Sequence, residues 1–220
     1  MSLREIRPGR FEILPPVIKN LLIINALVFL AQNVLPEETF HLTDLFALHA
    51  WQSPLFRPWQ FVTHLFMHGN LGHILSNMLA LWIFGTSLEV VWGSKRFLTF
   101  YIICGLGAAL CHMIVLYIEN NHLLEAWAVL KQNFNPDTVV NFFGNQHVEL
   151  DPDGIEAWRA NPGNAAQVHE ALSFCNQYVD ARLNTATLGA SGAVFGCLAA
   201  FGYLFPNRVI MFRFFIPMKA

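Results

Sequence analysis

The 220-residue sequence is poor in charge. Asp, Glu, Lys and Arg make up 13% of its residues, whereas a water-soluble domain usually carries about 25%. The 13 basic and 15 acidic residues nearly cancel, and no stretch gathers Lys and Arg into a basic stripe. Because nucleic-acid binding depends on such a stripe to neutralise phosphates, the sequence gives no indication of a nucleic-acid partner.

Cysteines are also few, and their positions do not indicate a disulfide framework. Cys104, Cys111 and Cys197 fall in apolar stretches, and only Cys175 falls in a polar one. The spacings CxxC and HExxH, which are typical of metal sites, are absent. We therefore predict no metal site and no cofactor.

Long apolar runs are what the sequence has in abundance. Four of them are close to the roughly 20 residues that an apolar helix needs to cross a bilayer. They cover residues 17–35, 72–92, 97–118 and 187–205. The sequence therefore predicts an all-α polytopic protein whose surroundings are a lipid bilayer.

The basic residues indicate how these spans are oriented. Nine of the 13 Lys and Arg residues lie before or at the start of the first span, between the second and third, or after the fourth. The other four are spread over two much longer connections. Because basic residues are enriched in cytoplasmic loops, we expect the N-terminus in the cytoplasm, and we expect a multi-pass protein of the plasma membrane.

Polar residues lie at the ends of two of these spans. His73 and Asn77 are four residues apart, and therefore on one face, near the start of the second span. Ser191 lies about four residues into the fourth span, so we expect all three at similar depth below the outer surface. Polar groups are costly to bury in a membrane, which makes these three candidates for a functional site.

The chemistry of the three residue types is complementary. A serine hydroxyl is a poor nucleophile until a base takes its proton, and attack on a peptide bond creates an oxyanion that needs fixed donors. The N–H groups of His73 and Asn77 are suitable donors. Gly189 and Gly192, which flank Ser191, allow close approach of a substrate or a helix. The simpler interpretation is that Gly192-xxx-Gly196 is a helix-packing motif.

Together, the run His68-x4-His73-x3-Asn77 and the sequence Gly189-Ala190-Ser191-Gly192 resemble the rhomboid family of intramembrane serine proteases. The resemblance implies a rhomboid-like helical bundle, with four transmembrane helices present of an expected six. It also implies that Ser191 is the nucleophile, that His73 and Asn77 stabilise the oxyanion, and that His68 stabilises the fold near the site.

The family's general base is a histidine on a later helix, whereas all nine histidines here precede Ser191. His73 is the one expected near Ser191. Residues 216–219 are expected to open another span. We therefore expect this chain to be the front portion of a longer protease and to be inactive by itself.

The predicted organisation has four parts. Residues 1–16 form a cytoplasmic tail, and residues 17–118 carry the first three spans with an outer interfacial loop at 36–71. Residues 119–186 form an extracytoplasmic insertion with nine acidic and three basic residues, and residues 187–220 carry the serine-bearing helix. In the insertion, Val168, Leu172, Cys175 and Val179 recur at helical spacing, and three Pro-containing segments are expected to be turns.

The predicted function is hydrolysis of peptide bonds in or near the transmembrane helices of membrane-protein substrates. The alternative is a non-catalytic rhomboid-like protein that binds membrane clients. A transporter is less well supported, because no Asp or Lys lies in the interior of a span. The sequence leaves the substrate and the oligomeric state open.

Overall fold

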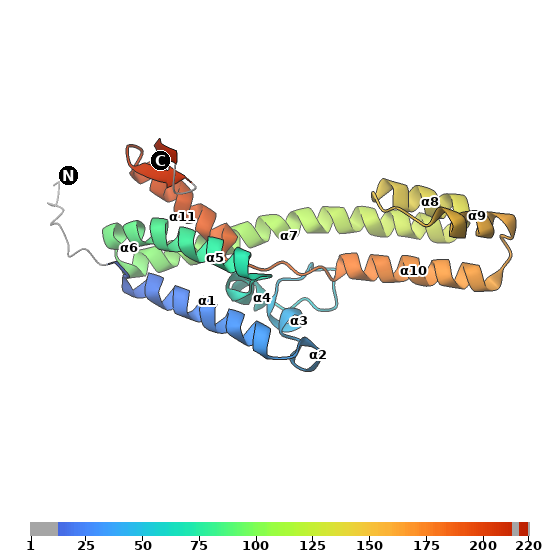
Figure 1. The fold of residues 1–220 in the computed structure, drawn as a ribbon, viewed down its shortest axis with the longest axis horizontal. Helices are drawn as coiled ribbons and strands as arrows, with labels where there is room; N and C mark the ends of the chain where they lie inside the picture. Colours follow the sequence, from blue (N-terminus) through green and yellow to red (C-terminus); the bar gives the residue numbers. More distant parts are fainter. Residues whose placement is uncertain (1–12, 213–215, 220) are drawn as a thin grey trace. The chain divides into compact units, whose positions relative to one another are not determined.

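The computed structural model describes residues 13–212 and 216–219, and these residues form two compact units (Figure 1). The first unit comprises residues 1–48, 57–112 and 186–220, and the second comprises residues 49–56 and 113–185. Most of the predicted N-terminal tail lies outside the described residues. So do four of the basic residues that indicated the orientation, Arg4, Arg7, Arg10 and Arg213.

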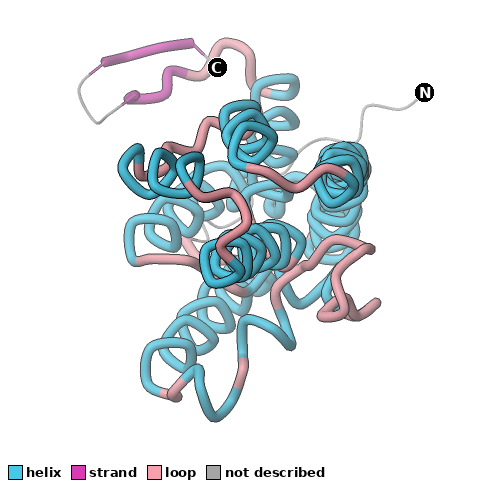
Figure 2. Tube along the Cα trace, turned by 90° about the vertical axis from the view of Figure 1, so that its right-hand side faces the viewer, coloured by secondary structure: helices cyan, strands magenta, loops and turns pink. Residues whose placement is uncertain are grey.

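The described part of the chain is mostly helical, as the predominance of cyan in Figure 2 shows. Three of its helical segments are long and apolar enough to cross a membrane: α1 (Pro16–Val34), the segment Leu71–Trp92 and α7 (Ser94–Gln132). The segment Leu71–Trp92 is continuous and consists of α5 (Leu71–Ala80), a π-helical turn η2 (Leu81–Gly85) and α6 (Thr86–Trp92). These helices confirm the predicted all-α polytopic membrane fold.

Two predicted spans differ from the helices observed. The third was expected to end at residue 118, but α7 continues to Gln132, so its 39 residues extend about 58 Å, roughly twice the thickness of the hydrocarbon core. The fourth was expected to begin at residue 187, but α11 (Ser191–Leu204) begins four residues later and has 14 residues. The reason is that Gly189 has a φ of 121°, which no helical residue adopts.

A buried carboxylate joins the beginning of α1 to α6. Glu89 is 2% exposed, and its two oxygens accept hydrogen bonds from the backbone N–H groups of Val17 (3.0 Å) and Ile18 (2.9 Å). Its Oε1 also accepts a bond from the Ser94 hydroxyl at 2.6 Å. N–H groups in the first turn of a helix have no partner within the helix, and the helix dipole favours negative charge there. Glu89 therefore caps α1 from a neighbouring helix.

Small residues bring α7 and α11 into close contact. Gly192 lies against Ala108, and a Cβ built on Gly196 would be 2.5 Å from the Sγ atom of Cys104. As the α11 residue number rises by four the α7 number falls by four, so the two helices are antiparallel. Gly192-xxx-Gly196 is thus a helix-packing motif of the kind common in membranes, whatever else the motif around Ser191 does.

The predicted interfacial loop contains short helices. They are α2 (Glu37–Phe40), α3 (Leu42–Phe46), α4 (Gln60–Thr63) and the 3-10 turn η1 (His64–Phe66). Gln60 is fully buried, where its Nε2 donates to the carbonyl of Asp44 (2.9 Å) and its Oε1 accepts from the N–H of Arg57 (3.0 Å). The indole of Trp59 donates to the carbonyl of Leu45 (2.9 Å). These bonds fix the two parts of the loop to each other.

The segment after α11 does not open a further span within the described residues. β1 (Val209–Phe212) and β2 (Ile216–Lys219) pair as an antiparallel hairpin, with Val209 opposite Lys219 and Phe212 opposite Ile216. The expectation that residues 216–219 begin a helix was therefore wrong. Four residues that include one Ile and one Met suit a strand as well as the first turn of a helix, and periodicity alone does not distinguish the two.

The second unit is a helical cluster with its own core. It contains the last part of α7 together with α8 (Pro136–Asn145), α9 (Pro152–Ala160) and α10 (Ala165–Leu183). The helical spacing noted in the sequence is confirmed, since α10 carries it and buries Cys175 and Val179. The core of this unit consists of Leu123, Trp127, Leu130, Val139, Phe142, Phe143, Trp158, Cys175 and Val179.

Candidate functional site

The start of α5 holds the first candidate residue. Asn70 is the N-cap, and its Oδ1 accepts the backbone N–H of His73 at 2.8 Å. The Nδ1 atom of the half-buried His73 faces the N–H of Gly69 at 3.5 Å. If Nδ1 is the acceptor, the proton of the neutral ring is on Nε2. In this tautomer the imidazole of His73 carries an N–H donor at Nε2, the ring nitrogen farther from the Gly69 N–H.

Asn77 lies one turn deeper and is held by His68. The Nδ2 atom of Asn77 is 3.1 Å from Nε2 of His68, and both residues are buried. His68 is itself fixed through its backbone, because its N–H donates to Oε1 of Gln32 (3.0 Å) and its carbonyl accepts from Nε2 of the same residue (3.2 Å). The structure thus brings His68 and Asn77 together and anchors them to α1.

Burial keeps the His68 ring neutral. The pKa of His68 is lowered from 6.5 to about 4, mainly by desolvation and in addition by the nearby His73, whose ring centre is 5.0 Å away, whereas the backbone of Phe66 opposes the shift. The Nδ2 atom of Asn77 can only donate, so this bond requires the neutral ring to have its proton on Nδ1 and its lone pair on Nε2. The other N–H of the Asn77 amide is not needed for this bond.

Gly189 brings the serine-bearing segment against these two side chains. A Cβ at this position would lie 2.6 Å from Nε2 of His73 and 3.6 Å from Nδ2 of Asn77, so the space that a side chain would take is next to both residues. Ser191 follows two residues later. Since consecutive Cα atoms are 3.8 Å apart, its Cα lies within about 7.6 Å of that of Gly189.

The segment before Ser191 is held by three contacts that the sequence did not predict. Thr187 forms an antiparallel bridge with Leu48, with both N–H to O distances at 2.8 Å. The hydroxyl of Thr187 is 2.8 Å from Nε2 of His112, and the N–H of Gly189 donates to the carbonyl of His64 at 2.9 Å. His73 is therefore not the only histidine near the serine-bearing segment, because His112 bonds to Thr187, four residues before Ser191.

Ser191 is the first residue of α11, not the fifth residue of a longer helix as the sequence suggested. No side chain caps this helix. As in any helix, its first N–H groups, beginning with that of Ser191, have no partner within the helix. They therefore concentrate positive charge at its start. The Ser191 hydroxyl has no hydrogen-bond partner among the described residues. The site thus contains donors for an oxyanion, but no base in contact with the hydroxyl in the described part of the chain.

Known proteins that are similar to this chain are rhomboid proteins. The sequence model of the rhomboid domain matches residues 56–123. RHOMBOID-like protein 12, mitochondrial, of Arabidopsis thaliana is 26% identical over 93% of this chain and 46% of its own length. An uncharacterized mitochondrial rhomboid protein of Schizosaccharomyces pombe is 26% identical over 97% of this chain and 55% of its own.

A third relative is a rhomboid protease, GlpG of Salmonella choleraesuis, which is 31% identical over 41% of this chain and 32% of its own length. The chain spans about half the length of the first two relatives. The chain therefore contains a match to the rhomboid domain at residues 56–123 and is similar to rhomboid proteins along most of its length.

Proposed function

We propose that this chain carries the nucleophile and the oxyanion donors of an intramembrane serine endopeptidase. One observation carries the proposal: Gly189, two residues before Ser191, lies against the Nε2 atom of His73 and close to the Nδ2 atom of Asn77. Two side chains of α5 and the segment that leads to Ser191, which are far apart in the sequence, thereby meet at one position. That position is also the start of a helix, where backbone N–H groups are free to bind an anion.

Each residue then has a defined part in acyl transfer. The Ser191 hydroxyl oxygen attacks the carbonyl carbon of the scissile peptide bond, and the carbonyl oxygen becomes an oxyanion. The N–H groups of His73, Asn77 and Ser191 itself stabilise that charge, which in other enzymes is worth about 10²- to 10³-fold in rate per donor. Collapse of the intermediate expels the amine, and water then releases the acyl group from Ser191.

The proton of the hydroxyl requires a base. General-base assistance typically contributes about 10²- to 10⁴-fold, and no histidine follows Ser191 in the 220 residues. We therefore expect a polypeptide of residues 1–220, by itself, to cleave no transmembrane substrate at a measurable rate. The alternative function, binding of membrane clients without cleavage, is favoured by the same lack of a base in contact with the Ser191 hydroxyl.

The proposed substrates are transmembrane proteins, cut in or near their membrane helices. The three long apolar helices make the chain a multi-pass integral membrane protein. The prediction of the plasma membrane has no support, because the two relatives that cover most of the chain are named as mitochondrial. The side on which the N-terminus lies stays a prediction.

A fluorophosphonate probe tests the nucleophile. In detergent, residues 1–220 are expected to react slowly, and faster when imidazole is added as an external base. Ser191→Ala should abolish the labelling under both conditions. Ser76→Ala is the matched control, since this exposed hydroxyl on α5 donates to the carbonyl of His73 and is not assigned to the chemistry.

Two results would contradict the proposal in different ways. Labelling that persists in Ser191→Ala would show that Ser191 is not the nucleophile. Cleavage of a transmembrane substrate by residues 1–220 without imidazole, abolished in Ser191→Ala, would show that these residues already contain a base.

A further inference from the structure

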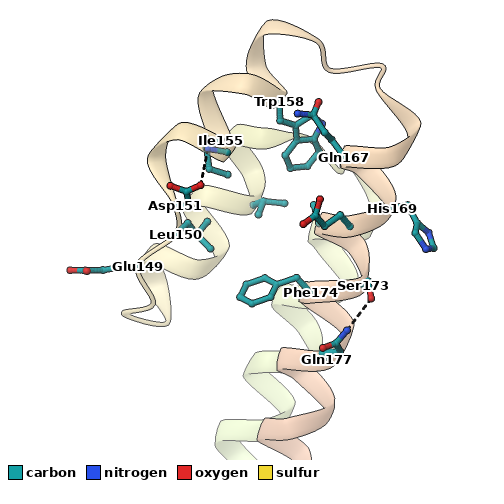
Figure 3. A pocket seen from close by; sticks show the side chains of 14 residues that line it. Glu149, Leu150, Asp151, Ile155, Trp158, Gln167, His169, Ser173, Phe174 and Gln177 are labelled. Atoms are coloured by element: carbon teal, nitrogen blue, oxygen red, sulfur yellow. Dashed lines mark hydrogen bonds between the residues drawn. The ribbon is translucent and has the colours of Figure 1, made fainter.

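The second unit contains a cavity that the proposed proteolytic chemistry does not use. Its volume is about 730 Å³, within the range of small-ligand pockets, and it opens between α10 and the segment leading into α9 (Figure 3). Apolar side chains line it, namely Val139, Leu150, Ile155 and Phe174. Phe174 is 47% exposed, so a large aromatic surface faces this space without being covered.

Two polar atoms at one end of the cavity are without partners. Nε1 of Trp158 and Oε1 of Gln167 are buried, and neither has a hydrogen bond among the described residues. Trp158 is 3% exposed and lines the cavity, and Figure 3 shows the Gln167 side chain beside its indole. An unpaired buried donor and an unpaired buried acceptor each cost free energy. Gln167 is only half-buried, so its side chain can swing aside to admit a ligand.

The charge around the cavity has one sign. Glu149, Asp151 and Glu170 line it, and no Lys or Arg is among its lining residues. Asp151 is already occupied, because its carboxylate caps α9 through the N–H groups of Asp153 and Gly154. Glu149 and Glu170 are exposed, and no ion pair involves either of them within the described part of the chain. Two negative charges therefore remain for a ligand.

We propose that this cavity binds a short peptide segment with a bulky apolar side chain flanked by Lys or Arg. The apolar side chain fills the space beside Phe174. An extended peptide offers both a carbonyl for the Trp158 N–H and an N–H for the Gln167 oxygen. The flanking basic residues meet Glu149 and Glu170. The proposal is independent of the chemistry at Ser191.

Binding is measured by fluorescence anisotropy with residues 1–220 in a non-ionic detergent. The probe is an end-blocked octapeptide with a central Leu-Phe pair and two lysines on each side, labelled with fluorescein. A second peptide has Glu in place of Lys, and a third has Gly-Ser in place of Leu-Phe. We expect saturable binding of the first alone, weakened at high salt because exposed charge pairs are screened. Ser191→Ala should bind the probe as well as the unaltered chain.

Variants separate the cavity from unspecific attraction to the micelle. Glu170→Gln should raise Kd about two- to fivefold, as expected for an exposed charge pair. Glu125→Gln, an equal charge change at an exposed position outside the cavity, should leave Kd unchanged. Phe174→Ala removes a half-exposed ring, which also contacts Phe143, and should raise Kd about tenfold.

The indole is tested with a matched pair of substitutions. Trp158→Phe removes the unpaired N–H and should raise Kd several-fold, whereas Trp127→Phe in the same core, but not lining the cavity, should not. Equal changes in Kd for the two variants would refute recognition of the peptide by the indole. They would indicate that the Trp158 N–H bonds to the Gln167 oxygen after a rotation of the Gln167 amide. Equal binding of the acidic peptide, equal binding of free lysine amide, or an unchanged Kd in Phe174→Ala would overturn the proposal.

Discussion

Gly189 is the position where the candidate site has no space for a side chain, and Gly189→Ala is the most direct test of the described geometry. The added methyl group would lie 2.6 Å from Nε2 and 2.7 Å from Cε1 of His73. Its φ of 121° is also outside the region that residues with a side chain normally adopt. The substitution therefore has two separate costs, one steric and one conformational.

The steric cost depends on whether His73 can move away. Its ring is packed edge-on against His68 with 5.0 Å between ring centres, and its backbone N–H is held by the Asn70 cap. Retreat would disturb both contacts. Overpacking of this kind costs about 1–3 kcal/mol, and the strained backbone about 1–3 kcal/mol more, so we expect Gly189→Ala to destabilise the protein by about 2–6 kcal/mol.

Thermal unfolding of the detergent-solubilised chain measures the effect through tryptophan fluorescence. For a chain of this size each 1 kcal/mol shifts Tm by about 2–4 °C, so Gly189→Ala should lower Tm by at least about 4 °C. Gly107→Ala is the matched control. Gly107 lies within α7, and no atom lies within 4 Å of the position that its Cβ would take. Alanine should stabilise the helix there by about 1 kcal/mol.

The two substitutions thus have opposite predicted signs. A Tm for Gly189→Ala equal to or above that of the unaltered protein would show that residue 189 is not packed against His73, and the assembly of the site around it would be refuted. A similar fall in Tm for Gly107→Ala would show that the assay reports a general intolerance of substitution.

Two further predictions concern stability. Glu89→Gln leaves at most one of the two α1 N–H groups with a good acceptor, and because a hydrogen bond to a charged group is worth about 1.5–3 kcal/mol, it should lower Tm by several degrees. The control Glu125→Gln, at an exposed position, should leave Tm unchanged. An equal Tm for the two variants would show that Glu89 does not cap α1. Because the pKa of His68 is about 4 in the folded state and 6.5 ordinarily, the unfolded chain binds more protons between these values. The contribution of His68 to the free energy of unfolding should therefore be complete above pH 6.5 and be lost as the pH falls towards about 4. His68→Gln should reduce this pH dependence of stability, and the exposed His169→Gln should leave it unchanged.

The parts of the fold that the sequence predicted correctly are those set by long-range composition. An apolar run of about 20 residues has few alternatives to a membrane helix, because every backbone polar group must be paired inside the bilayer. The helix ends were less predictable. The continuation of α7 to Gln132 passes from apolar to polar sequence without a Gly or Pro to end it, so the loss of hydrophobicity at residue 118 did not mark a helix end.

In the second unit, two predicted turns are the beginnings of helices. Asn135 and Asp151 are N-caps whose side chains accept N–H groups of the following turn, and Pro136 and Pro152 occupy the first helical position. Asn-Pro and Asp-Pro favour both a turn and a helix start, since proline at the first helical position loses no hydrogen bond. The sequence after the proline decides between them, and in both segments it permits a helix.

The residues of the candidate site can be proposed from the sequence, but the contacts that position them cannot. His73, Asn77 and Ser191 are identified by motif and by the rarity of polar groups in apolar sequence. Nothing local indicates that Thr187 pairs with Leu48 or that His112 bonds to Thr187. These contacts join segments 75 or more residues apart, and a single sequence contains no signal for such pairs.

The contacts that hold the segment before Ser191 explain why a serine at the start of a helix suits the proposed acyl transfer. Had α11 begun at residue 187, the N–H of Ser191 would bond to the carbonyl of residue 187 and would not be available to an oxyanion. The positive φ of Gly189 and the bridge from Thr187 to Leu48 prevent that helical turn from forming. Glycine is therefore required at position 189 twice over, for the conformation that ends the extended segment and for the space that His73 fills. Because α11 begins at Ser191 and not at residue 187, its first N–H groups lie near the side-chain donors His73 and Asn77.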